Sequence, residues 1–186
     1  PTAIKITRLL YGGLNYEPSF IGLRRPTIVY SNHVDLIDPF VVYDAFKRAT
    51  DEHFYPLMRD DFFGRYSSII NPIFKKGGVI LISRSGSKEE REEDKNEIKK
   101  HVAKGHNIYV APATTRSKTG EIFYSPKISG PSTIPLIVGG GVDMLAANYT
   151  HDPVTKDITV RFGDIQEFEM PEGRREQISY VKEMNE

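Results

Sequence analysis

The chain of 186 residues is long enough to bury the core of one domain, and a single domain covering residues 1–186 is expected. Its composition, with 39% hydrophobic and 27% charged residues, is that of an ordinary globular protein. The 25 basic side chains balance the 25 acidic ones and there is no cysteine, which argues against general attraction to nucleic acid and excludes disulfides, thiolate metal sites and thiol catalysis.

Apolar, β-branched runs alternate with helical segments along the chain. Thr27–Tyr30 follows Pro26 and is typical of a buried strand. Asp38 and Pro39 then favour a helix start, with the aspartate as N-cap and the proline at the first helical position. Further strands are predicted at 79–82, 107–110, 134–138 and 158–162, and further helices at 88–103 and 174–184.

This alternation indicates an α/β fold in which a sheet is layered with helices. In such folds, ligands usually bind beyond the carboxyl ends of the strands. The residues that follow each predicted strand are therefore the first candidates for a functional site.

His33 and Asp38 lie on either side of the predicted turn between the first strand and the first helix. A histidine five residues before an aspartate can fold back so that the carboxylate meets the imidazole, fixes its tautomer and raises the basicity of the outward nitrogen. Such a pair suits removal of a proton from an alcohol. The alternative is structural, with Asp38 acting only as an N-cap and His33 only as a turn residue.

Four short motifs in sequence resemble those of the glycerolipid acyltransferases, the lysophosphatidic acid and glycerol-3-phosphate acyltransferase superfamily. Each motif is weak alone, but their order and approximate spacing agree over residues 27 to 165. They are Asn32-His33 with Asp38, Gly78 through Arg84, Pro112 through Ser117, and Ile134-Pro135-Leu136-Ile137.

The resemblance implies a mixed sheet flanked by helices and an O-acyltransferase activity. His33 would be the general base on an acceptor hydroxyl and Asp38 its orienting partner. The acyl donor would be a thioester of coenzyme A or acyl carrier protein, and the acceptor a lysophospholipid or a related molecule. No metal and no further cofactor are expected. The substrate-binding residues would be Arg84, Thr115, Arg116, Ser117, Gly78 and Pro135, with the two arginines holding a phosphate.

The third motif departs from the family pattern. Ala113 stands where the family has glutamate, and Thr114 where it has glycine. These changes fall on the acceptor side of the expected site and leave His33 and Asp38 untouched. Two alternatives therefore accompany the acyltransferase prediction: a lipid-binding relative with altered catalysis, and a hydrolase acting on esters or thioesters.

A peripheral position on a membrane, at the cytoplasmic side, is expected from the lipid acceptor. No apolar run approaches the roughly 18–20 residues that cross a bilayer, and no signal peptide is visible. Ile6, Leu9 and Leu10, with Lys5 and Arg8, favour a short amphipathic helix that is expected to pack onto the domain; contact with a membrane surface is the alternative.

Overall fold

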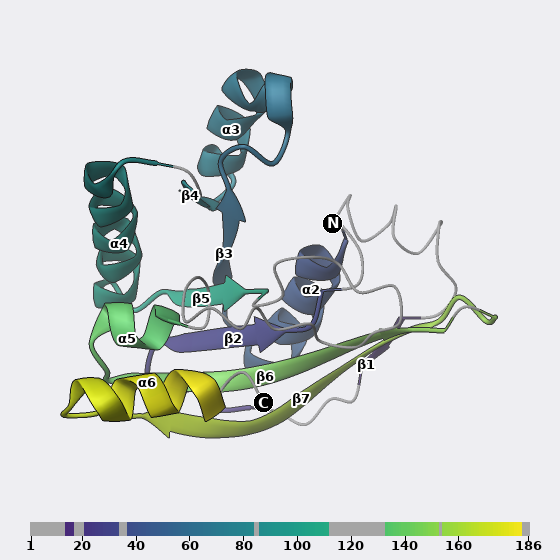
Figure 1. The fold of residues 1–186 in the computed structure, drawn as a ribbon. Coiled ribbons are helices and arrows are strands. Elements are labelled where there is room, and N and C mark those ends of the chain that lie inside the picture. Colours follow the sequence, from purple (N-terminus) through teal and green to yellow (C-terminus); the bar gives the residue numbers. More distant parts are fainter. Residues whose placement is uncertain are drawn as a thin grey trace.

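The structure, a computed structural model, describes residues 14–16, 21–33, 37–83, 86–111, 133–152 and 154–183. Figure 1 shows a sheet with helices on both sides. The strands are β1 (Leu14–Tyr16), β2 (Thr27–Ser31), β3 (Phe54–Arg59), β4 (Ile80–Ile82), β5 (Asn107–Val110), β6 (Val142–His151) and β7 (Ile158–Phe168). The helices are α2 (Asp38–Thr50), α3 (Ser67–Lys76), α4 (Lys88–Ala103), α5 (Ile134–Val138) and α6 (Arg174–Glu183), with the short 3-10 turn η1 (Gly64–Tyr66) before α3.

Within the described residues, the strands form one seven-stranded sheet in the order β1-β7-β6-β2-β5-β3-β4. β2 is parallel to both of its neighbours, β5 and β6, while β6 and β7 form the antiparallel pair. The predicted α/β class, with a mixed sheet flanked by helices, is confirmed. Because β2 is the middle strand, the residues that follow it lie midway across the sheet, at its carboxyl end.

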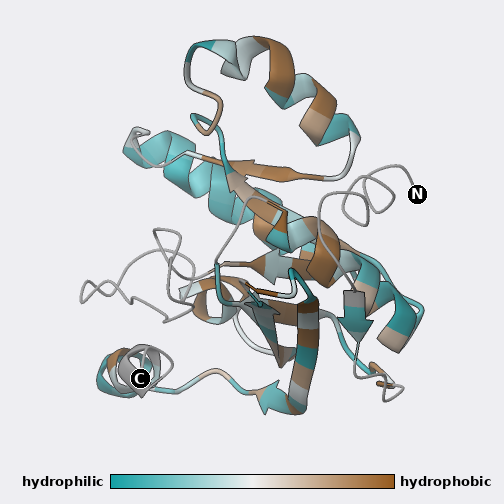
Figure 2. Ribbon diagram, turned by 90° about the vertical axis from the view of Figure 1, so that its right-hand side faces the viewer, coloured by the Kyte–Doolittle hydropathy of each residue, from teal (hydrophilic) through white to brown (hydrophobic). Residues whose placement is uncertain are grey.

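Alternate residues of β2 face two separate cores. Val29 lies in a cluster with Val42 and Phe46 of α2, on one face of the sheet. Ile28 lies in the other cluster, against Ile98 of α4, together with residues of α5 and α6. Figure 2 shows the apolar strands between these layers and the hydrophilic α4. Among the described helices, α2 packs in the Val29 cluster, whereas α4, α5 and α6 pack in the Ile28 cluster. Asp38 is the first residue of α2.

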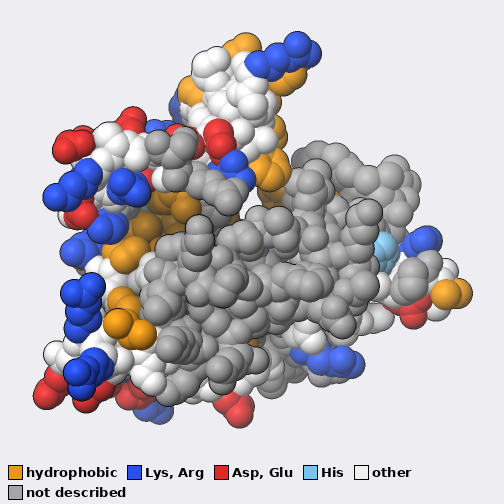
Figure 3. All heavy atoms as spheres, in the orientation of Figure 1, with side chains coloured by type: hydrophobic (Ala, Val, Ile, Leu, Met, Phe, Trp, Pro, Cys, Tyr) orange, Lys and Arg blue, Asp and Glu red, His pale blue; other side chains and the backbone are white. Residues whose placement is uncertain are grey.

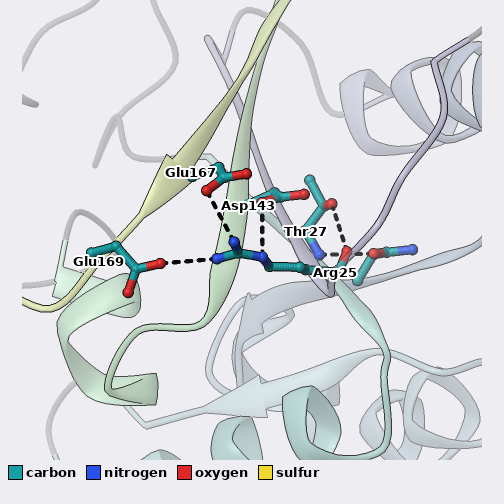
Figure 4. Close-up of polar contacts among 6 residues, drawn as sticks. Arg25, Thr27, Asp143, Glu167 and Glu169 are labelled. Carbon is teal, nitrogen blue, oxygen red and sulfur yellow. Dashed lines mark hydrogen bonds and ion pairs between the residues drawn. The ribbon is translucent and has the colours of Figure 1, made fainter.

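The amino ends of β2 and β6 are joined by a cluster of charged side chains around Arg25 (Figure 4). Its guanidinium bonds Glu167 at 2.9 Å and Glu169 at 3.0 Å, and its Nε lies 4.0 Å from Asp143. Burial raises the pKa of the Asp143 carboxyl, although the nearby arginine opposes this effect. The two glutamates are largely exposed, so their ion pairs with Arg25 contribute little to stability.

One predicted element has the wrong type. Residues Ile134–Val138, predicted as a strand, form helix α5. Pro135 lies in its first turn, where a missing N–H costs nothing, and Gly139 ends it with a φ of +88°. The helix is apolar because Ile134 is buried in the core beside α4. A short buried helix and a short buried strand give the same apolar run.

Candidate active site

The histidine and the aspartate predicted as a pair are in contact. His33 follows the carboxyl end of β2, and Asp38 is the first residue of α2. Nδ1 of His33 lies 3.1 Å from Oδ2 of Asp38, which is hydrogen-bonding distance. The end of β2 and the start of α2 thus bring the two side chains together, as the spacing predicted.

Asp38 is not the N-cap of α2, and this part of the sequence prediction is wrong. The N-cap is Ile37, and no side chain caps the helix. Asp38 lies one residue further on, with its side chain completely buried and its carboxylate directed at His33. The unpaired N–H groups of the first helical turn favour a negative charge at this position. The structure therefore gives Asp38 no N-cap hydrogen bond, and its catalytic role stays a prediction.

The contact leaves one nitrogen of the imidazole for chemistry. A carboxylate accepts hydrogen bonds, so the contact with Asp38 favours a proton on Nδ1 of His33 and a lone pair on Nε2. The side chain of His33 keeps a fifth of its surface exposed, whereas that of Asp38 has none. An accessible imidazole held by an inaccessible carboxylate is the arrangement that a general base requires.

Asn32, which the sequence offered only as a motif residue, holds the turn to the neighbouring strand. Its carboxamide oxygen accepts a hydrogen bond of 2.7 Å from the N–H of Tyr149, and its Nδ2 donates one of 2.7 Å to the carbonyl of Tyr149. These bonds continue the parallel ladder of β2 and β6 beyond its last pair, Ser31 and Ala147. The residue before His33 is thereby fixed to the sheet.

Two buried hydroxyls support the same turn, and sequence reasoning missed both. Ser31 donates to the carbonyl of Asn32 at 2.7 Å, so Tyr109 of β5 donates to the Ser31 oxygen at 3.0 Å. Burial and the nearby charge of Asp38 raise the pKa of the Tyr109 hydroxyl, which therefore stays protonated as a donor. One signal in the sequence could have indicated the position of Ser31. Successive residues of a strand point to opposite faces, so Ser31 faces the α2 side, as Val29 does.

The other predicted site residues are not brought to this pair by the described structure. Arg84, Thr115, Arg116 and Ser117 lie outside the described residues, so their predicted convergence on one anion site stays a prediction.

Gly78 and Pro135 are described, and both precede strands. Gly78, with a φ of +89°, precedes β4, and Pro135 lies in α5, which leads into β6. β2 is parallel to β6 directly and to β4 through β5 and β3, so these two residues belong to the opposite sheet edge from His33. Their part in substrate binding stays a prediction.

The described parts of the chain contain neither a cluster of metal ligands nor a helix that could span a membrane. There, no three His, Asp or Glu side chains gather closely enough to hold a metal ion. Nor does any helix in those parts have the length and apolar character needed to cross a bilayer.

Comparison with known proteins identifies the family of the chain. A family model described as Acyltransferase matches residues 11–131, and because this is more than half of its length, the chain belongs to the acyltransferase family. The solved structure of the 1-acyl-sn-glycerophosphate (LPA) acyltransferase PlsC from Thermotoga maritima has the same fold, with a TM-score of 0.66. The two chains are 15% identical, and the match covers 98% of this chain and 73% of that one. Comparison with curated protein sequences gives no match.

Together, the family match and the structural likeness confirm the resemblance to the glycerolipid acyltransferase superfamily. The His33–Asp38 contact lies inside the matched residues, at the middle of the sheet. The chain is thus an acyltransferase by family, and its catalytic residues, donor and acceptor are matters for proposal.

Proposed function

We propose that this protein transfers a fatty acyl group from a thioester to a hydroxyl of a lysophospholipid or related acceptor, with His33 as general base. The observation that carries the proposal is the contact of 3.1 Å between His33 and the buried Asp38, at the end of the middle strand. Family membership supplies the reaction class. The donor is acyl-CoA or acyl carrier protein, and no other cofactor takes part.

The proposed reaction proceeds in two steps. Nε2 of His33 takes the proton of the acceptor hydroxyl while its oxygen bonds to the thioester carbonyl carbon. The resulting tetrahedral intermediate then collapses, the carbon–sulfur bond breaks, and the thiolate leaves with the proton held by the histidine. The charge of Asp38 stabilises the imidazolium that exists between these steps. No covalent acyl-enzyme forms, in keeping with a histidine base and the absence of cysteine from the chain.

The acceptor's phosphate is assigned to the two motif arginines. Arg84 follows β4 in the chain, and Arg116 follows β5. β4 and β5 run in the same direction as β2, so the last described residues after them, Ser83 and Ala111, lie at the same end of the sheet as His33, which supports this assignment. A guanidinium binds phosphate oxygens in pairs, and the hydroxyls of Thr115 and Ser117 add donors beside Arg116.

In this proposal the protein works at a membrane surface on the cytoplasmic side, where its lipid acceptor resides. The whole of residues 1–186 acts as one catalytic domain. The replacements at Ala113 and Thr114 are proposed to set which acceptor head group is used, because the third motif is assigned to that side of the site.

The test is product analysis with defined substrates. The protein is incubated with isotope-labelled acyl-CoA or acyl carrier protein thioesters and a panel of lysophospholipids and glycerol 3-phosphate, and lipid products are identified by mass spectrometry. With the acceptor that wild type uses, His33→Ala should lower the rate of ester formation by about 10²–10⁴. Asp38→Asn, which keeps the volume but not the charge, should also lower kcat. His53→Ala, which removes an exposed histidine elsewhere, should leave the rate unchanged.

The same experiment separates the two alternatives. Labelled free fatty acid as the product with every acceptor would identify a hydrolase that uses His33 on water. Lipid binding without any product would identify a non-catalytic relative. Equal ester formation by wild type and His33→Ala would contradict the proposed mechanism.

A further inference from the structure

Helix α3 exposes large apolar side chains on one side and directs polar side chains toward a cleft on the other. Ser67, Ser68, Asn71 and Lys75 line a cleft of about 430 Å³ that α3 shares with β4 and α4. The opposite side of the helix carries Ile69 and Ile73, whose surfaces are 69% and 66% exposed. A surface helix of a globular protein normally buries its apolar stripe and exposes its polar one.

The exposed apolar stripe extends beyond the helix. Tyr66 precedes Ile69 and Ile73 by three and seven residues, which puts the three on one helical face, and Phe62 precedes them in the chain. Tyr66 and Phe62 are also largely exposed. In Figure 2, apolar colour marks α3 where it stands clear of the sheet, and Figure 3 shows hydrophobic side chains along the outline of this part of the molecule. We call these four side chains the α3 apolar stripe.

The charged side chains of η1 and α3 are all basic, and the nearest acidic residues in the chain, Asp60 and Asp61, precede Phe62, with Asp61 paired to Arg59 at 2.6 Å. Residues 62–76 contain Arg65, Lys75 and Lys76 and no acidic residue, although the whole chain carries no net charge. Lys76 follows Ile69 by seven residues and so shares its face. The guanidinium of Arg65 lies 4.8 Å from the centre of the Tyr66 ring, at the edge of the stripe. Lys75 instead lines the cleft, together with Asp60 and Glu93.

We infer that the α3 apolar stripe, with Arg65 and Lys76, is a docking surface for an anionic phospholipid bilayer. Large apolar side chains flanked by cations suit an interface of acyl chains and negative head groups, because each group meets its complement there. Burial of an isoleucine side chain among acyl chains is favourable and does not require a partner of complementary shape. An acidic protein partner would complement only the cations. The inference concerns a surface and needs no turnover, so it stands independently of the reaction proposed for His33.

The test is co-flotation of the chain with vesicles, without substrate. Wild type should bind phosphatidylcholine vesicles that contain about one third phosphatidylglycerol and should bind pure phosphatidylcholine vesicles less well. Ile69→Ser with Ile73→Ser should lower the partition coefficient at least about tenfold. Arg65→Glu with Lys76→Glu should weaken binding and make it less sensitive to salt.

Two matched variants control for general effects of composition. Val154→Ser removes an apolar side chain that is 86% exposed but far along the chain, and Arg174→Glu with Arg175→Glu reverses an exposed basic pair on α6. Both should bind vesicles as wild type does. Circular dichroism and thermal unfolding should show that all variants remain folded, since none of the substituted residues is buried.

Three results would overturn the inference. The first is vesicle binding by the Ile69/Ile73 variant that equals wild type, which would assign membrane contact to another segment such as residues 5–10. The second is equal binding of wild type to anionic and neutral vesicles, or to neither. The third is a wild-type dimer in sedimentation velocity that the Ile69/Ile73 variant abolishes without any vesicle binding, which would make the stripe a contact between copies.

Discussion

Two asparagines do the same work at opposite ends of the middle strands. Asn32, beyond the carboxyl end of β2, bonds the backbone of Tyr149 through both carboxamide atoms. Asn107, at the amino end of β5, accepts from the N–H of Thr27 at 2.8 Å and donates to the carbonyl of His53 at 2.9 Å. Each carboxamide imitates a peptide group by accepting from a backbone N–H and donating to a backbone carbonyl. Only Asn32 also carries the candidate base as its next residue.

This difference gives a matched test of positioning. Asn32→Ala and Asn107→Ala each remove two hydrogen bonds from a buried carboxamide to the backbone, so each should lower the free energy of unfolding by about 1–3 kcal/mol in urea denaturation. Asn32→Ala should in addition lower kcat of acyl transfer, measured well below the unfolding transition, because His33 loses its fixed position. Asn107→Ala should leave kcat per folded molecule at the wild-type value.

The ratio of the kcat values of Asn32→Ala and Asn107→Ala shows whether Asn32 positions His33 or serves only the fold. Similar kcat values at similar loss of stability would mean that Asn32 serves the fold alone. A fall in kcat restricted to Asn32→Ala, with KM little changed, is the expected result for a residue that positions the base without touching the substrate.

Sequence reasoning reached the candidate pair but not its support, and the reason is separation along the chain. His33 and Asp38 are five residues apart, across a turn whose strand and helix both carry local signals. Tyr109 reaches Ser31 from 78 residues away. Such a contact depends on which strands are neighbours, and no local pattern of one sequence fixes strand order. The long-range supports of His33 therefore became visible only in the folded chain.

Among the elements, α4 was predicted to the residue because its signals are local. Opposite charges recur three and four residues apart, and Ser87 with Glu90 forms a reciprocal capping box at its start. Strand β3 was missed because Pro56 interrupts it, and proline weakens a strand pattern. In the sheet, β3 pairs with β4 only from Leu57 onward, so Pro56 has an open side for its missing N–H.

Strand β6 was missed for a different reason. Its first four residues, Val142–Leu145, are all buried, and alternation begins only afterwards. The register with β7 shifts between Leu145 and Ala147, as at a β-bulge. A strand that changes from two buried faces to one has no single period of hydrophobicity to detect.

The cap of α4 is a prediction at the scale of one helix. Ser87→Ala removes the side-chain oxygen that accepts from the N–H of Glu90 and frees the first turn, so the free energy of unfolding should fall by about 0.5–2 kcal/mol. Ser68→Ala, in the first turn of α3 where no side chain caps the helix, should change it by less than about 0.5 kcal/mol. Urea denaturation measures both, and equal losses would contradict the role of the capping box.

At the scale of the whole molecule, stability should depend on pH through a partly buried histidine where α4 packs against β3. His101 of α4 and His106, just before β5, place their Nδ1 atoms 3.1 Å apart, and both rings contact Tyr55 of β3. Burial lowers the pKa of His101 below its ordinary value, and the positive charge of a protonated His106 and that of Lys104 add to this effect. Glu97 opposes it.

The sign of the effect follows from the direction of this shift. The unfolded chain binds a proton at His101 near pH 6.5, while the folded chain resists it, so the contribution of His101 to stability is present above pH 6.5 and is lost as the pH falls through the lower pKa of the folded state. One such group changes the free energy of unfolding by at most about 1.4 kcal/mol per pH unit. His101→Gln should flatten the fall measured by urea denaturation between pH 6.5 and 5, whereas the exposed control His53→Gln should retain it. A fall of the same steepness in wild type and His101→Gln would show that the protons are taken up elsewhere in the molecule.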